Sequence, residues 1–211
     1  MASEQTSKRI LLTGGKGFYE EKRSRFLGES FPVENEEEAL TVIAGMKKKY
    51  YDARHNCYAF IVNGVNRSSD DGEPSGTAGR PILSVLEGEE IDSILVVVTR
   101  YFGGVLLGGG GLVRAYTAAA KDAIAHSETA VLKLCCRVRA SVDYAAFEKI
   151  RRLSDRSGFS VSGVEYSDGV AFTATGVSGT GDIIRRSLSD LTGGKAVILS
   201  EEENVWIREK E

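Results

Sequence analysis

His55 and Cys57 are the residues of this 211-residue chain whose types and spacing best suit nucleophilic chemistry. They stand two positions apart at the start of an apolar segment, so a strand there would project both side chains on one face. A histidine can activate a cysteine thiolate, and Asp52 could orient the imidazole ring. The alternative is structural, because free cysteine is among the most buried residue types and a histidine often bonds a nearby carbonyl. The sequence favours the structural interpretation.

Metal chemistry has weaker support than nucleophilic chemistry. The chain has two histidines and no Cys-x-x-Cys pair, so zinc hydrolysis and zinc deamination lack their ligands. Asp70, Asp71 and Glu73 could hold a hydrated magnesium ion, but their spacing lacks the alternating oxygens of a calcium loop. We therefore expect neither a metal nor a cofactor.

The most unusual segment is the glycine-rich run Gly103–Gly111, which contains Gly103, Gly104, Gly110 and Gly111. Glycines between a strand and a helix let successive N–H groups point at an anion, to which the helix N-terminus adds partial positive charge. The alternative is a tight crossing that needs positive φ at several residues. Neither nucleotide-binding fingerprint fits the run, which disfavours an ATPase, a GTPase or a dinucleotide-binding enzyme.

Every basic residue between Tyr50 and Ala120 is an arginine, and each stands in or beside a loop. The planar guanidinium group suits bidentate recognition of phosphate or carboxylate. The same window holds eight acidic residues, so internal ion pairs explain the five arginines equally well. The predicted surface for an anion, RNA or a protein partner comprises Arg54, His55, Arg80, Arg100, Tyr101, Gly103, Gly104, Gly110, Gly111 and Arg114, and the fifth arginine of the window is Arg67.

The elements that position these residues fall into two blocks. The first begins after a loose lead-in over residues 1–19 and covers residues 20–128. Its expected elements, in order, are a strand at Phe26–Val33, a helix at 36–50 capped by Asn35 and Glu38, a strand at Cys57–Val62, a loop at Asn63–Gly79, a helix or turn at Pro81–Leu86, a strand at Ile94–Phe102 and a helix at Leu112–Ala125.

The second block, residues 129–211, alternates strand and helix patterns. The expected elements are a strand at Val131–Val142, a helix at Tyr144–Ser157, a hairpin of Phe159–Tyr166 and Val170–Val177, a helix at Asp182–Leu191 and a strand at Ala196–Ile207. This β-α-β-β-α-β order predicts a ferredoxin-like domain. Arg137 and Arg139 fall on one face of its first strand, where a basic stripe can track a phosphate backbone but more often is a solvated surface.

The composition limits the classes of function. With 42% hydrophobic and 27% charged residues, the chain can bury a core, which excludes intrinsic disorder. The net charge of −3 excludes a wholly basic surface, so any nucleic-acid contact must be a local patch and no readout of a DNA sequence is expected. Three cysteines and no long apolar run predict a cytoplasmic protein that makes no membrane contact.

Four segments of the first block together resemble the YigZ/IMPACT family. They are Asp52–Ala59 (DARHNCYA), Asp70–Pro81 (DDGEPSGTAGRP), Arg100–Gly104 (RYFGG) and Gly110–Tyr116 (GGLVRAY). The match is ordered and spans roughly residues 20–125, and the rest is similar to the smaller C-terminal domain of bacterial members. Two positions depart from the family pattern: Leu106 replaces a lysine, and Gly109 replaces a threonine or alanine.

The resemblance implies a two-domain α+β fold. The first domain would share the α/β fold of elongation factor G domain IV and of a small-subunit ribosomal protein, and the ferredoxin-like second domain would resemble elongation factor G domain V. Eukaryotic relatives modulate translation by competing for an activator of the amino-acid-starvation kinase, and the family has no established catalytic residue.

The favoured hypothesis is therefore a non-enzymatic, cytosolic regulator of translation that binds RNA, the ribosome or a translation-related protein through the surface predicted above. The alternatives are a Cys57- and His55-dependent hydrolase or transferase, with Asp52 orienting the ring, and a pure protein-interaction module.

Overall fold

The computed structural model describes residues 6–208 and divides into two compact units. The first unit is Lys8–Val131, and the second comprises Leu132 onward together with Thr6 and Ser7. The division falls inside one long strand, β8 (Glu128–Val142), slightly beyond the boundary at 128/129 that composition suggested. Each unit has a core of its own and is described by itself.

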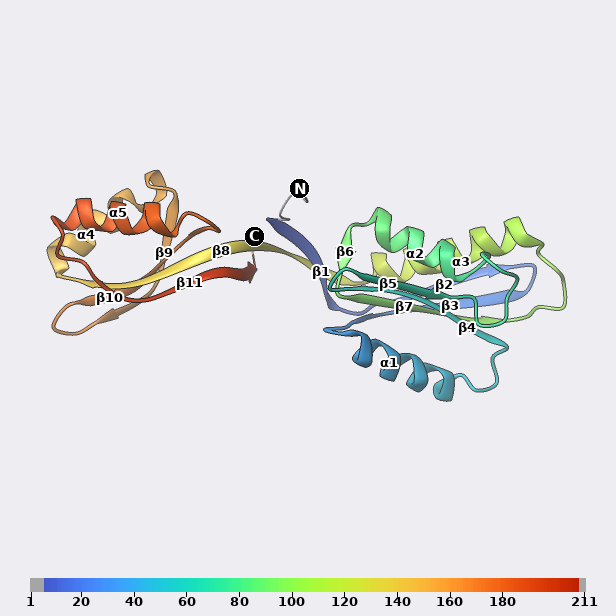
Figure 1. The fold of residues 1–211 in the computed structure, drawn as a ribbon. Coiled ribbons are helices and arrows are strands. Elements are labelled where there is room, and N and C mark those ends of the chain that lie inside the picture. The colour runs from blue at the N-terminus through green and yellow to red at the C-terminus, as the bar shows by residue number, and fades with distance from the viewer. Residues whose placement is uncertain (1–5, 209–211) are drawn as a thin grey trace. The chain divides into compact units, whose positions relative to one another are not determined.

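A five-stranded antiparallel sheet forms the centre of the first unit (Figure 1). Its strands lie in the order β2 (Lys16–Glu21), β3 (Ser24–Pro32), β7 (Ile94–Tyr101), β4 (His55–Val62) and β5 (Val65–Ser69). All residues of β7 except the last are buried, which explains why its first five residues are all aliphatic.

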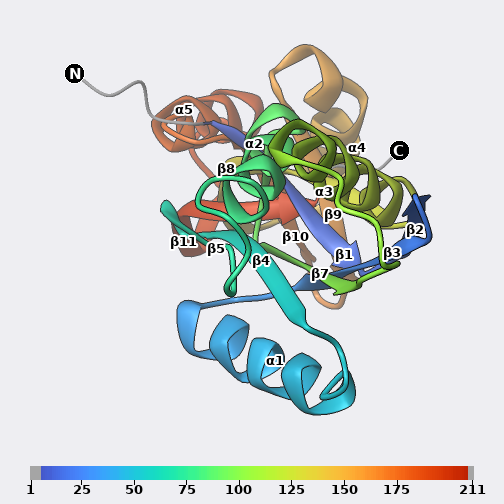
Figure 2. The ribbon, with the colours of Figure 1, turned by 90° about the vertical axis from the view of Figure 1, so that its right-hand side faces the viewer.

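Helices cover both faces of this sheet. Helix α1 (Glu36–Lys49) lies on one face, and α2 (Gly79–Gly88) and α3 (Gly109–Ala125) lie on the other (Figure 2). The alternation along β7 assigns the faces: Val96 and Val98 pack under α2 and α3, and Leu95 and Val97 pack under α1. Arg100 continues the first set, so its side chain enters the α2/α3 face of the sheet.

The start of the chain corrects one expectation. Residues 1–19 were expected to be a loose lead-in, but the described part contains β1 (Ser7–Thr13) and β2. Strand β1 pairs in parallel with the short β6 (Ile91–Asp92), and β2 pairs with β3 through the two-residue turn Lys22-Arg23. Both turn residues have positive φ, 48° and 64°, as a type I′ hairpin requires. Because neither is glycine or asparagine, the usual sequence signal of this hairpin is missing.

The expected loop at Asn63–Gly79 is also shorter than its composition suggested. Val65–Ser69 forms the edge strand β5, which pairs with β4 through the turn Asn63-Gly64. Apart from that turn, only the segment from Asp70 to Ala78 lies outside helices and strands in this range. Beyond the turn Asn63-Gly64, the sequence gives no sign of this strand, because four of its five residues are exposed and its polar pattern shows no buried face.

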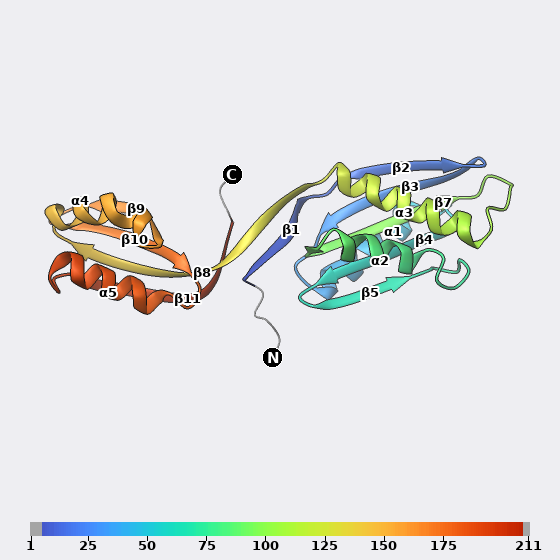
Figure 3. The ribbon, with the colours of Figure 1, turned by 90° about the horizontal axis from the view of Figure 1, so that it is seen from above.

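The second unit has the predicted ferredoxin-like order. After β8 follow α4 (Tyr144–Leu153), a short 3₁₀ turn (Ser154–Arg156), β9 (Phe159–Tyr166), β10 (Val170–Val177), α5 (Gly181–Thr192) and β11 (Val197–Arg208). The sheet order is β11-β8-β10-β9, with every neighbouring pair antiparallel. Helices α4 and α5 lie side by side on one face of this sheet (Figure 3). The mixed α+β, two-domain fold is thereby confirmed.

Candidate functional site

The four motif segments of the first unit meet around one buried carboxylate, that of Glu73. Arg100 Nη1 donates to Glu73 Oε1 at 2.6 Å, and the Tyr116 hydroxyl donates to the same oxygen at 2.8 Å. His55 Nε2 stands 4.0 Å from it. The Cys57 sulfur lies 3.3 Å from the Tyr116 hydroxyl. We call these five side chains the Glu73 cluster.

The Glu73 cluster is almost closed to solvent. The side chains of Arg100 and Glu73 are 8% and 3% exposed, and the guanidinium stacks at 5.5 Å over Phe26 and at 5.6 Å over Phe102. Burial raises the pKa of Tyr116, which keeps its hydroxyl protonated and able to donate to Glu73. Arg100 Nε is the buried side-chain polar atom that finds no hydrogen-bond partner among the described residues. A buried pair of this kind is strongly destabilised when one partner is removed, so the cluster ties its segments together.

The cluster does not build the nucleophilic machinery that His55, Cys57 and Asp52 suggested. Burial raises the pKa of Cys57 to about 12, and its sulfur lies 3.0 Å from the Asp70 carbonyl oxygen. His55 Nδ1 lies 2.8 Å from the Asp71 carbonyl oxygen, which can only accept, so Nδ1 carries the proton. Asp52 accepts a hydrogen bond from the Tyr101 hydroxyl at 2.9 Å. Cys57 is therefore held as a neutral thiol, and Asp52 is engaged elsewhere than at the imidazole ring.

Two aspartates fix the loop that carries Glu73. Asp70 Oδ1 accepts from the backbone N–H groups of Ala78 and Gly79 at 3.0 and 2.8 Å, and its other oxygen accepts from Gly76 N–H at 2.8 Å. Burial raises the pKa of Asp70, but these three hydrogen bonds outweigh it and leave the pKa lowered.

Asp71 ties the same loop to the sheet and to α1, because its carboxylate accepts from the N–H of Asn56 at 2.7 Å and from Lys47 at 2.6 Å.

Four of the five window arginines have carboxylate partners. Arg100 is paired inside the Glu73 cluster, and the other three pairs, all at the surface, are Arg67 with Glu36 at 2.6 Å, Arg80 with Glu87 at 3.3 Å and Arg114 with Glu21 at 3.8 Å. Among the described residues, Arg54 alone of the five makes no ion pair, and it is exposed. Arg80 lines a groove of about 430 Å³ between α2 and α3, together with Val113 and Lys121. The predicted arginine surface is thus divided among several environments.

The glycines of this run allow one close contact between backbone segments and two turns with positive φ. A side chain at Gly103 would collide with the backbone of Arg23 and Ser24, and the Gly103 N–H donates to the Ser24 hydroxyl at 3.1 Å. Gly104 and Gly108 have φ of +85° and +74°, a conformation that other residues rarely adopt. Gly111 is buried at the start of α3, and Gly110 is exposed one residue earlier. No side chain caps α3.

The structure adds cations that the arginine window left out. The turn Lys22-Arg23 lies against the loop that follows β7, since Lys22 Nζ reaches the Leu106 carbonyl at 3.5 Å. Arg25 stacks at 5.1 Å over the ring of Tyr101. We call five exposed cations at this end of the first unit the basic rim: Lys22, Arg23, Arg25, Arg54 and Arg114. The half-buried Tyr101 and the exposed Phe102 lie at the same end. The missed hairpin turn is the reason that sequence reasoning omitted its first three members.

Within residues 6–208, no three His, Cys, Asp or Glu side chains gather as the ligands of a metal ion would. No helix in that range combines the length and the apolar character needed to span a membrane.

Comparison with known proteins extends the motif argument to most of the chain. Residues 22–124 match the family described as Impact N-terminal domain. The IMPACT family member YvyE of Bacillus subtilis is 36% identical over 180 residues, which are 84% of this chain and 83% of that protein. The "IMPACT family member in pol 5'region" of Thermus thermophilus is 38% identical over 175 residues, which are 82% of this chain and 96% of that protein.

A solved structure is similar in fold as well. It is described as the crystal structure of a hypothetical protein, and it matches at a TM-score of 0.61 and 28% identity over 95% of this chain and 100% of its own. The expectation from the four motif segments is confirmed, and the chain belongs to the IMPACT family.

Proposed function

We propose that this protein is a non-enzymatic regulator of translation that binds RNA through the basic rim of its first unit. The observation that carries the proposal is that five exposed cations share the end of the sheet where β3 begins, β7 ends and β4 begins. Tyr101, Phe102 and the glycine-rich loop lie at the same end. Cations that follow a phosphate backbone, with aromatic rings on which bases stack, are the usual components of single-strand binding surfaces.

The charge balance of the rim supports an anionic ligand. Its five cations face three nearby acids. Glu20 stands across the β2–β3 ladder from Arg25, Glu21 stands 3.8 Å from Arg114, and Asp52 accepts from Tyr101. An ion pair as exposed as Arg114–Glu21 contributes little and is readily exchanged for a phosphate. In a chain of net charge −3, such a patch is a local positive surface, which is the arrangement the composition left possible.

The Glu73 cluster has a supporting role in this proposal. It is closed to solvent, and its thiol is neutral, so it suits the task of holding the loops that form the rim better than a task in covalent chemistry. Arg100 and His55 then belong to the support of the surface and not to its contacts.

The test is a fluorescence-polarisation titration of the full chain with a labelled single-stranded RNA at several salt concentrations. We expect the logarithm of the affinity to fall linearly with the logarithm of the salt concentration. Arg25→Ala/Arg54→Ala should weaken binding by about 1–3 kcal/mol for each lost charged contact. The control is Arg67→Ala, which removes another exposed arginine, from β5 outside the rim, and its effect is compared with that of each single rim substitution.

Three results would contradict the proposal: no salt-sensitive binding, equal affinity of the rim variant and the control, or RNA binding that an acidic peptide of equal charge displaces fully. The last result would favour a translation-related protein as the partner.

A further inference from the structure

The sheet of the second unit leaves one face open. Alternate residues of β8, namely Cys136, Val138 and Ala140, pack in the core under α4 and α5. The intervening residues point to the opposite side, where no helix of the unit lies (Figure 1). This face lines a shallow cavity of about 1020 Å³ formed by β8, β9, β10 and β11.

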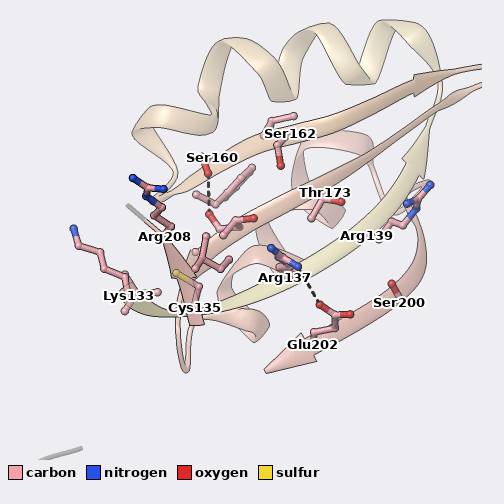
Figure 4. Close-up of a pocket in the computed structure, with 17 residues that line it drawn as sticks. Lys133, Cys135, Arg137, Arg139, Ser160, Ser162, Thr173, Ser200, Glu202 and Arg208 are labelled. Atoms are coloured by element: carbon pink, nitrogen blue, oxygen red, sulfur yellow. Dashed lines mark hydrogen bonds and ion pairs between the residues drawn. The ribbon is translucent and has the colours of Figure 1, made fainter. Parts of the chain in front are cut away.

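Cations and hydroxyl groups dominate the open face. The cations are Lys133, Arg137, Arg139 and Arg208, and the hydroxyls are those of Ser160, Ser162, Thr173, Thr175 and Ser200. Figure 4 shows Arg137 in the middle of the face, with Arg139 towards one end and Lys133 and Arg208 towards the other. Among the acids, Glu202 lines the cavity, so the lining carries four positive charges against one negative charge.

Strand register places these groups in rows across the sheet. Arg139 stands between Ser200 of β11 and Thr173 of β10. Arg137 stands between Glu202 and Thr175 in the next row on the same face. Two residues of a strand advance about 6.8 Å, so the two guanidinium groups repeat along β8 with a short, regular spacing.

The arginines are available to a ligand because their present partners are weak. Arg137 lies 3.7 Å from Glu202, and Arg139 lies 2.7 Å from Glu165; in both pairs each side chain is at least 41% exposed. Exposed pairs of this kind contribute between nothing and about 1 kcal/mol, and a phosphate can replace the carboxylate.

We propose that the open face of the β8–β11 sheet binds the ribose-phosphate backbone of single-stranded RNA, with Arg137 and Arg139 on successive phosphates. Charge complementarity selects a polyanion, and the row of hydroxyls, which donate and accept, suits the 2′-hydroxyl groups of a ribose strand. An extended acidic peptide usually adds to a sheet edge, where backbone groups are free, and a sheet face offers none.

The face also predicts how the RNA is held. Phe159 is the aromatic residue among the described residues that line the cavity, and it is 4% exposed and packed in the core. The described lining therefore presents no aromatic ring on which a base could stack. Binding there is expected to be insensitive to base sequence and strongly dependent on salt. This inference rests on the proposed RNA-binding role and adds to it a second contact surface.

The experiment uses the full chain, a fluorescent 12-nucleotide oligo(U), and its 4-thiouridine form for photo-crosslinking. Arg137→Ala/Arg139→Ala should weaken binding at least about tenfold and reduce the salt slope by about 1.4, since each phosphate contact on a single strand contributes about 0.7. Arg151→Ala/Arg186→Ala, which removes two exposed arginines from α4 and α5, is the matched control and should change the affinity less than twofold. Crosslinks are expected on the peptides of β8 and β10.

The outcomes separate this inference from the proposed function. If Arg25→Ala/Arg54→Ala alone loses affinity and all crosslinks lie in the first unit, the open face is overturned and the basic rim stands. If only Arg137→Ala/Arg139→Ala loses affinity, the open face stands and the rim is overturned. Equal affinity of the sheet variant and its control, or full displacement of the RNA by poly-glutamate of equal charge, overturns the inference. Circular dichroism should show that Arg25→Ala/Arg54→Ala and Arg137→Ala/Arg139→Ala keep the fold, because none of these four arginines is buried.

Discussion

The Glu73 cluster and the open face of the second sheet use the same kinds of side chain in opposite ways. Both place arginine beside glutamate and hydroxyl groups on a strand face. In the cluster, Arg100 and Glu73 are at most 8% exposed, and in the open face, Arg137 and Glu202 are 42% and 56% exposed. The difference is what covers the sheet: loops and α3 in the first case, and solvent in the second.

That difference decides what an arginine can do. A buried guanidinium must keep its carboxylate partner, because no water is available to solvate its charge once the carboxylate is removed. An exposed guanidinium exchanges partners at little cost. The motif segments therefore supply an internal brace at Arg100, whereas exposed arginines such as Arg25 and Arg137 have no buried partner that they must keep.

The largest difference in stability between the two regions is expected when the Glu73 carboxylate is removed. Glu73→Ala leaves the Arg100 guanidinium buried without its partner and should destabilise the protein by about 3–5 kcal/mol. Glu202→Ala removes the partner of Arg137 on the open face and should cost at most about 1 kcal/mol. Urea denaturation of both variants measures the difference, and equal losses would show that the cluster is no more a brace than a surface pair.

The alkylation rates of the cysteines in the two regions provide a second test of the same comparison. Burial raises the pKa of Cys57 to about 12 from an ordinary value of 9.0, which lowers its thiolate fraction at neutral pH about a thousandfold. Cys135 is half-buried on the open face, and burial raises its pKa as well. Iodoacetamide should therefore alkylate Cys135 well before Cys57 in the folded protein, as mass spectrometry of the peptides can follow.

Fast, pH-dependent labelling of Cys57 would contradict this prediction and would support the hypothesis of a Cys57- and His55-dependent hydrolase or transferase. Labelling in urea, where both thiols are exposed, provides the control.

Close packing beside the cluster predicts a moderate effect at Gly103. A methyl group there would collide with the backbone of Arg23 and Ser24, so Gly103→Ala should destabilise by about 1–3 kcal/mol. Gly45→Ala is the matched control, because Gly45 lies inside α1 with open space around it and should gain about 1 kcal/mol of helix stability. Thermal melts distinguish the two, and a neutral Gly103→Ala would mean that the loop can move away from the β2–β3 turn.

Much of the fold follows from hydrophobic patterning. The second unit was predicted element by element, since Val170–Val177 alternates along most of its length, Phe159–Tyr166 alternates up to Ser162, and each helix has an apolar stripe. The failures are elements without a buried face of their own. Val65–Ser69 is an exposed edge strand, which only the turn Asn63-Gly64 announces. The hairpin at Lys22-Arg23 lacks even that signal, because its positive φ values fall on long side chains.

The site was less predictable than the fold for a related reason. Sequence shows that Arg100 and Glu73 are chemically able to pair, but the distance between them depends on which face of β7 each loop covers. The hydrophobic pattern locates β7 but does not show which loop covers each of its faces. The sequence therefore allows Arg100 to be either a ligand contact or the partner of an internal ion pair. The Glu73 cluster forms only when β3, β4 and β7 pair in this register, and no single segment of the sequence specifies that register.

The smallest expected effect concerns the pH dependence of Asp70, which holds the loop beside the cluster. Burial raises the pKa of Asp70, but hydrogen bonds from Gly76, Gly79 and Ala78 leave it below its ordinary value of 3.8. A carboxyl group with a lowered folded pKa contributes stability above its unfolded pKa and loses it as the pH falls through the folded value. Asp70→Asn should therefore cost about 1–2 kcal/mol at pH 7 and progressively less below pH 4.

Glu165→Gln, at the exposed partner of Arg139, is the comparison on the open face and should change stability little at either pH. Urea midpoints at pH 7 and pH 3 measure both variants. A constant difference between Asp70→Asn and the unchanged chain at the two pH values would mean that the charge of Asp70 is not what the three N–H groups recognise. Asp70 would then hold the loop as a hydrogen-bond acceptor whose charge does not matter, and the two regions would differ in their burial but not in how their acids respond to protons.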